Sequence, residues 1–338
     1  MKKNIKIRPP VSAIIIFSIF GFLMFSLYKG NQLVNKTEKE VSPELHSGES
    51  NAMSYELKEI DSKTGDIRWK RTAKEGTTQN ELQGASIKDI ELTVFKNKEI
   101  VFNLKAPEAK ANSNTKEILL LGGVITKSKD ENFILNSNKL SITKGTELEA
   151  LGGFNLILKE NGTLEGERAK INEEQTKVKI ENLKRATLKD IEITGKSVEI
   201  ERDSKTIKKA TISNYGQIIL MNMDSLSAKQ IEWINGETIK AKSNIIFTSG
   251  ERQIKAGNLL INSDNTFTAE NNVVILDKDI ECSGERLNYN NTQLIEITGK
   301  PRAIQGNKII SADKILYDTK LKKLEAVGNV KTSIKNKT

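Results

Sequence analysis

Residues 269–332 decide the fold of this chain: AENNVVILDKDIECSGERLNYNNTQLIEITGKPRAIQGNKIISADKILYDTKLKKLEAVGNVKT. Large or apolar residues recur there in pairs separated by one polar residue, at Val273/Ile275, Ile280/Cys282, Leu287/Tyr289, Ile315/Tyr317 and Leu324/Ala326. A period of two is that of a half-buried strand. The polar breaks between the pairs, such as residues 277–279 and 290–291, have the composition of turns. The stretch therefore predicts one strand after another, with no room for a helix.

The strand pattern repeats along the chain with a period of about 29 residues. Glycines mark several copies, at Gly123, Gly153, Gly299 and Gly328. A fixed period in this range indicates stacked supersecondary units rather than a closed globular core. Residues 108–300 also contain no proline, which fits continuous strand ladders because a central strand needs every backbone N–H.

The composition suits a thin two-layer β stack. Of the 338 residues, 37% are hydrophobic, 5% are aromatic and 29% are charged. The net charge is +9, but beyond the N-terminus the cations and anions are interspersed, as on solvated strand faces. No cluster of Lys and Arg with aromatic residues marks a nucleic-acid surface, so no nucleic-acid partner is expected.

The sequence contains one cysteine and one histidine, which limits the chemistry to be expected. Cys282 lies in an apolar strand pair and reads as a small buried hydrophobe, and no intramolecular disulfide can form. His46 lies in a polar segment, so neither a metal-ligand cluster nor a nucleophile–histidine pair stands out. We expect no metal, no cofactor and no catalytic residues, and hence a protein that is not an enzyme.

The N-terminus predicts a membrane anchor. Residues 1–10 are basic, and the uncharged apolar run at residues 11–28 is just long enough for a membrane-spanning helix. Positive residues before the run place 1–10 in the cytoplasm and the rest of the chain outside. A cleaved signal peptide is the alternative, although no A-x-A-like site follows. Residues 29–54 read as a flexible stalk and residues 333–338 as a frayed tail.

Residues 55–73 predict a hairpin, in which Tyr55/Leu57 and Ile67/Trp69 alternate on either side of a turn. Trp69 is either a core residue at the start of the array or a contact with a membrane partner.

Three features resemble the LptC/LptA (OstA-like) family of periplasmic lipopolysaccharide-transport proteins. They are the short basic arm with a single anchor, the segment from Tyr55 to Ala73, and the repeat ISADKILYD…LEAVGNV within residues 310–330. The resemblance covers nearly all of residues 55–332. The chain is close to twice the length of an ordinary LptC, which indicates an LptC-like part over 55–190 continuing into an OstA/LptA-like part over 191–332.

The resemblance implies an all-β fold: an elongated, open, antiparallel β-jellyroll whose two facing sheets enclose an apolar groove. It also implies a non-enzymatic bridge, held in the inner membrane by one helix with its bulk in the periplasm. Such a bridge receives lipopolysaccharide or a related glycolipid from inner-membrane ABC transporter subunits and passes it toward the outer membrane. At about nine residues per strand, roughly thirty strands in two sheets would extend on the order of 70 Å.

Alternation along the strands gives candidates for the groove lining, and because the two roles overlap in such a fold, plain inter-sheet core is the default for each: Phe154, Leu156, Leu158, Phe267, Val273, Ile275, Leu287, Tyr289, Ile315 and Tyr317. Candidates for partner docking are Trp69, Leu324 and Val330. Leu324 and Val330 lie at a C-terminal strand edge. Either a further β-jellyroll protein adds a strand to this edge, or the chain caps the edge itself. The alternative function is a membrane-anchored β-solenoid scaffold or adhesin with no lipid cargo.

Overall fold

The computed structural model describes residues 50–60, 65, 67–78, 85–112, 117–143, 147–203 and 206–334. The chain divides into two compact units, residues 1–49 and 50–338, and the first lies outside the described residues. The predicted cytoplasmic arm (1–10), membrane-spanning segment (11–28) and most of the predicted stalk (29–54) therefore lie outside them too. Within the part that is described, no helix has the length and apolar character needed to cross a membrane.

All regular structure in the described residues is β-strand, as predicted. The strands are β1 (Ser50–Ile60), β2 (Ile67–Thr78), β3 (Ala85–Lys96), β4 (Glu99–Asn112), β5 (Glu117–Ser128), β6 (Phe133–Ile142), β7 (Leu148–Leu158), β8 (Gly162–Ile171), β9 (Lys177–Leu188), β10 (Ile191–Arg202), β11 (Ile207–Leu220), β12 (Ser225–Ile234), β13 (Thr238–Ser249), β14 (Arg252–Asn262), β15 (Phe267–Asp277), β16 (Ile280–Tyr289), β17 (Leu294–Thr298), β18 (Arg302–Gln305), β19 (Lys308–Ser311), β20 (Lys314–Asp318), β21 (Lys323–Val327) and β22 (Lys331–Ile334). β1 begins within the segment expected to be stalk, and β22 extends into the expected tail.

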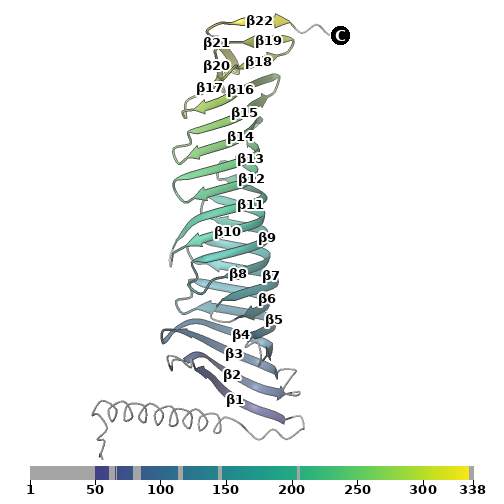
Figure 1. Ribbon diagram of the computed structural model, residues 1–338, viewed down its shortest axis with the longest axis vertical. Coiled ribbons are helices and arrows are strands. Elements are labelled where there is room, and N and C mark those ends of the chain that lie inside the picture. The colour runs from purple at the N-terminus through teal and green to yellow at the C-terminus, as the bar shows by residue number, and fades with distance from the viewer. Residues whose placement is uncertain are drawn as a thin grey trace, which may run out of the picture. The chain divides into compact units, whose positions relative to one another are not determined.

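The strands form one continuous antiparallel ladder rather than two separate sheets (Figure 1). Each strand from β1 to β16 pairs with the next one along the chain, for example β9 with β10 and β10 with β11. Most of these strands have 10 to 12 residues, for example β8 and β9, which is longer than the nine expected. The described residues form 22 strands, fewer than the roughly thirty expected, and each long strand runs through both layers.

A bend near the middle of each long strand folds this ladder into two facing layers. The strand registers shift there, for example between Leu121 and Val124 and between Lys242 and Ile245. The bend requires positive backbone φ angles, which glycine adopts without strain and asparagine tolerates better than most residues. Gly122 and Gly123 take this role in β5, and Asn244 takes it in β13. We call this line of bends the corner.

At the C-terminal end the two layers become separate half-strands. The first half of β16 pairs with β18, whereas its second half pairs with β17. One layer then continues through β19 and β22, and the other through β20 and β21. The first break falls at Pro301, which cannot donate a backbone hydrogen bond and so interrupts the strand at the corner.

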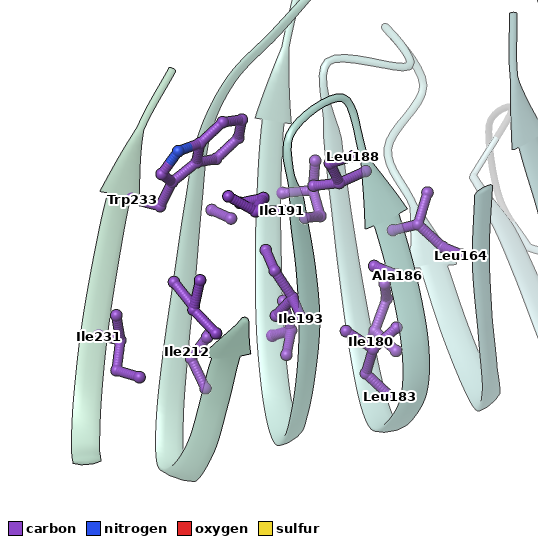
Figure 2. Packing of buried hydrophobic residues seen from close by; sticks show 14 of the residues in the cluster. Leu164, Ile180, Leu183, Ala186, Leu188, Ile191, Ile193, Ile212, Ile231 and Trp233 are labelled. Atoms are coloured by element: carbon purple, nitrogen blue, oxygen red, sulfur yellow. The ribbon is translucent and has the colours of Figure 1, made fainter. Parts of the chain in front are cut away.

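Alternating side chains from both layers fill the space between them. Figure 2 shows part of this interior, with Leu183 toward the bend of β9 and with Leu188, Ile191 and Trp233 toward the opposite end of the strands. The single core cluster runs without a break from Ala73 to Tyr317. The outward residues are largely charged, and cross-strand pairs such as Lys105–Glu91 at 2.6 Å lie in solvent. This is the mixed-sign solvated face that the sequence predicts.

Candidate functional site: the apolar interior and its mouth

Hairpin turns lie along two edges of the folded ladder. Edge A carries the turns that follow odd-numbered strands from β3 to β15, and edge B carries those that follow even-numbered strands from β8 to β16. Every long strand runs from one edge, around the corner, to the other. The two edges therefore face each other on the side away from the corner, and we call the line between them the mouth. Any large apolar ligand that enters the interior sideways must pass it.

The predicted groove residues all belong to the interior. Nine of them are buried, with exposed fractions between 0% and 6%: Phe154, Leu156, Leu158, Phe267, Val273, Ile275, Leu287, Ile315 and Tyr317. Tyr289 is partly buried and packs against the same cluster. All ten belong to, or pack against, the one hydrophobic cluster between the layers, so the interior is filled by protein in this conformation.

An aromatic contact crosses the interior from one layer to the other. Phe247 lies near the edge-A end of β13, and Phe267 lies at the edge-B end of β15. Their ring centroids are 5.6 Å apart, in the edge-on arrangement that aromatic pairs favour. Phe267 also contacts Tyr289, with centroids 4.8 Å apart. These rings hold the layers together at this level.

Ion pairs cross the mouth near the N-terminal end of the ladder. The ammonium of Lys96, at the end of β3 on edge A, lies 3.0 Å from Glu174 and 3.5 Å from Glu173 in the β8–β9 turn on edge B. The hydrogen bond to Glu174 raises the pKa of Lys96. All three side chains are partly exposed, so this contact is readily broken.

A buried amide closes the mouth further along. The side-chain oxygen of Asn161, in the β7–β8 turn on edge A, accepts a 3.1 Å hydrogen bond from the backbone N–H of Ile207 at the start of β11 on edge B. Asn161 is almost fully buried. Because a buried N–H that loses its acceptor costs free energy, this contact is harder to break than the Lys96 pairs.

A charged cluster closes the mouth near the C-terminal end. The side chain of Asp277, at the end of β15 on edge A, is fully buried. One of its oxygens accepts hydrogen bonds from Tyr317 Oη at 2.6 Å and Lys322 Nζ at 2.5 Å, both from the edge-B layer. Arg252 Nε, on edge A, lies 3.3 Å from the same oxygen.

The protonation equilibria of this cluster follow from those contacts. Burial acts to raise the pKa of Asp277, but the hydrogen bonds from Lys322 and Tyr317 outweigh it and leave the pKa below its ordinary value. Burial and the bond to Asp277 together raise the pKa of the Tyr317 phenol. The cluster is therefore an ionised carboxylate held by a neutral phenol and two cations.

Cavities indent the mouth between these contacts. One of about 630 Å³ lies beside the Lys96 pairs and is lined by residues of the β3–β4 and β5–β6 turns together with Glu174, Gln175 and Arg202. Burial lowers the pKa of the Arg202 guanidinium there. A second cavity, of about 600 Å³, lies between the β9–β10 and β11–β12 turns on edge A and the β12–β13 and β14–β15 turns on edge B. Both cavities have walls from the two edges.

The two ends of the ladder differ from its interior. Trp69 in β2 is partly buried against the core, and the guanidinium of Arg71 lies 5.0 Å from its ring centroid. At the other end, β21 and β22 each have a strand partner on one side only among the described residues. Leu324 is half-buried and Val330 is exposed there. Of the residues that close the mouth, the sequence predicts only Tyr317, and only as a groove residue. Nothing local in the sequence marks a contact between segments 40 or more residues apart.

Comparison with known proteins gives two family matches that meet inside the ladder. Residues 13–189 match the family described as lipopolysaccharide-assembly, LptC-related, and residues 186–323 match the LptA/(LptD N-terminal domain) LPS transport protein family. Among solved structures, the chain is similar to LptH, the LptA homologous periplasmic component of the lipopolysaccharide transport device from Pseudomonas aeruginosa. That match has 14% identity and a TM-score of 0.31, and it covers 33% of this chain and 95% of LptH. No curated protein matches the sequence.

Proposed function

Because this chain belongs to the LptC-related lipopolysaccharide-assembly family, whose match spans more than half of its length, we propose that it carries lipopolysaccharide between its two β layers toward the outer membrane. The LptA-like match over residues 186–323 supports a chain that combines an LptC-like and an LptA-like part. Membership in a family of transport proteins also confirms that the chain is not an enzyme.

The observation that carries the proposal is the unbroken apolar interior. Leu156, Ile193 and Ile275 are fully buried in β7, β10 and β15, and every intervening strand adds side chains of the same kind. Each methylene of an acyl chain that is removed from water gains about 0.8 kcal/mol. Successive levels of the ladder offer similar surroundings, so an acyl chain can move along it at nearly constant free energy.

Loading requires the two layers to separate, because side chains fill the interior in this conformation. The mouth is the side on which they can part, because the covalent backbone of each long strand joins the layers at the corner, whereas a few polar side-chain contacts join them at the edges. Lipid then replaces side-chain contacts between the layers with acyl-chain contacts. The sugar headgroup stays in water along the mouth.

The two ends of the ladder suit protein partners of different kinds. The predicted N-terminal anchor and the partly buried Trp69 in β2 support docking of inner-membrane ABC transporter subunits, which supply lipid and energy, at the β1 end. The exposed edges of β21 and β22 offer unpaired backbone groups to another β-jellyroll protein, through strand addition. Deleting residues 323–334 removes both edge strands and should abolish co-purification of that protein. Unchanged co-purification would disprove this docking site.

The alternative, a scaffold without lipid cargo, is separated from this proposal by crosslinking. A photoreactive benzoyl-phenylalanine at Phe154, which points inward in β7, should form an adduct with lipopolysaccharide in living cells. The same group at Ile157, which is exposed on the outer face of β7, should not. Equal labelling at both positions, or no labelling at Phe154, would contradict transport between the layers.

A further inference from the structure

The cavity between the β9–β10 and β11–β12 turns and the β12–β13 and β14–β15 turns opens directly onto the apolar interior. Its inner wall is made of Ile191, Trp233, Ile239 and Ile261, which all belong to the core cluster. These four side chains keep 6–8% of their surface exposed, whereas most interior residues keep 0–2%. Figure 2 shows Trp233 and Ile191 at the ends of their strands, away from the bends.

No polar contact between described residues holds the mouth shut at this level. Among the described residues of the turns that line the cavity, each hydrogen bond joins two residues of the same edge. Asn222 bonds Asp224 on edge A, and Asn235 bonds Ile207 on edge B. The nearest polar contacts that cross the mouth are Asn161–Ile207 on one side and Asp277–Tyr317 on the other. The layers can therefore separate here at the lowest cost in polar interactions.

The turn beside the cavity exposes two large apolar side chains. Met221 and Met223 in the β11–β12 turn are 73% and 81% exposed, and Met221 lines the cavity. Methionine is flexible and polarisable, so it adapts to apolar partners of varying shape. Leu220, at the end of β11, continues this apolar surface inward to Trp233.

The rim of the cavity has a different chemistry. It consists mainly of uncharged carboxamide and hydroxyl groups: Asn222, Asn235, Asn262, Ser263 and Asn265. Such groups both donate and accept hydrogen bonds, as sugar hydroxyls do. The charged groups of the rim are Lys189, Asp190 and Glu237, so the rim does not favour an anion. A volume of about 600 Å³ lies within the usual range of small-molecule sites.

We propose that this cavity is a lateral port through which the acyl chains of a glycolipid enter or leave the interior partway along the bridge. The inference rests on the proposed function and adds the place of passage. Acyl chains pass between Met221 and the edge-B turns to reach Trp233 and Ile191, while the saccharide contacts the asparagine rim. The port lies just beyond residues 186–189, where the two family matches meet, so lipid can pass into the LptA-like part there.

Photo-crosslinking of the full chain in living cells tests the port. Benzoyl-phenylalanine at Met221 should form an adduct with lipopolysaccharide. The matched control is Glu160, which is exposed in another edge-A turn but lies beside the closing contact of Asn161. Tyr289, a partly buried aromatic residue of the interior, reports on passage between the layers.

The outcomes separate the port from the general function. Adducts at Met221 and Tyr289 with none at Glu160 support the port. Adducts at Tyr289 alone, or equal adducts at Met221 and Glu160, overturn the port and leave the transport proposal standing. Adducts at Met221 alone support the port and overturn passage along the interior, and no adduct at any of the three positions overturns both.

Fluorescence gives a second measurement that does not depend on photochemistry. Trp69→Phe leaves Trp233 as the single tryptophan of the chain. A dibrominated stearic acid should quench its fluorescence, and lipopolysaccharide should relieve the quenching by competition. In the Trp233→Phe variant, which keeps Trp69, quenching should be much weaker. Equal quenching of both variants, or binding of the acid without quenching of Trp233, would overturn the port.

Discussion

The phenol of Tyr317 in β20 donates a 2.6 Å hydrogen bond to the carboxylate of Asp277 at the end of β15, and this bond ties edge B to edge A across the mouth. Both side chains are buried. Tyr317 was predicted as a groove residue from its alternation with Ile315, and its ring does belong to the interior. Its hydroxyl has a role that alternation does not predict, because it helps to close the C-terminal part of the mouth.

Removing that hydroxyl should loosen the C-terminal part of the ladder. A hydrogen bond to a charged group contributes about 1.5–3 kcal/mol of stability. Tyr317→Phe loses this free energy, so local hydrogen exchange in β17 and β20 should be faster by the equivalent Boltzmann factor. Tyr289→Phe is the matched control, because the Tyr289 hydroxyl has no hydrogen-bond partner among the described residues. Equal protection in wild type and Tyr317→Phe would show that the bond does not close the mouth.

The Asp277 cluster should also respond to pH. The folded pKa of Asp277 lies below its ordinary value of 3.8, so the stabilisation that the carboxylate supplies is present above about pH 3.8. It is lost as the pH falls through the lower folded value. Tyr317 behaves in the opposite sense, because its pKa is raised in the folded protein. The stabilisation that its phenol supplies is fully present below pH 10 and is lost as the pH rises further.

Asp277→Asn isolates this titration from that of the other carboxylates. Near neutral pH the variant should lose about 2–4 kcal/mol of local stability, less than a fully buried ion pair would, because 37% of Lys322 is exposed. The difference from wild type should shrink as the pH falls below 3.8. Hydrogen exchange across β15–β20 measures it, and a difference that does not change with pH would contradict the assignment.

Inward and outward neighbours on one strand should differ strongly in their effect on stability. Leu156 is fully buried in β7, whereas Ile157 beside it is 38% exposed. Leu156→Ala should cost about 2–5 kcal/mol, and Ile157→Ala less than about 1 kcal/mol. Urea denaturation followed by circular dichroism compares them. Equal costs would show that the strand faces have been assigned wrongly.

The contacts that cross the mouth should differ in strength. Asn161→Ala leaves the buried N–H of Ile207 without this acceptor and should cost about 1–3 kcal/mol. Lys96→Ala removes only partly exposed ion pairs, so its effect should be much smaller and should vanish at high salt. Hydrogen exchange at β8–β11 in low and high salt separates the two variants. A larger effect for Lys96→Ala would reverse the proposed order.

The sequence predicts the strands and their inward faces well, because alternation is a local signal. It also detects the period of about 29 residues, but the structure changes what that period means. Gly123, Gly153, Gly299 and Gly328 lie at or beside the corner, where positive φ angles are required. Copies that lack the glycine use asparagine for the same purpose, as at Asn182 and Asn244. The repeat is thus one of backbone bends as much as of apolar strands.

The contacts across the mouth could not be predicted in this way. Lys96 and Glu174 are 78 residues apart, and Asp277 and Lys322 are 45 apart. Which turns face each other depends on how the layers are offset after folding, and the repeat is too uniform to specify that offset. For the same reason the sequence predicts two sheets, although the structure forms one sheet folded at its corner.

The most direct test of transport between the layers is the distance across the mouth. Spin labels on Asn222→Cys, on edge A, and Glu237→Cys, on edge B, report it by double electron–electron resonance. The native Cys282 should stay unlabelled, because it is buried and its pKa is raised to about 12. Since side chains fill the interior, binding of lipopolysaccharide should lengthen the distance and widen its distribution. An unchanged distance in protein shown to hold lipopolysaccharide would contradict passage between the layers.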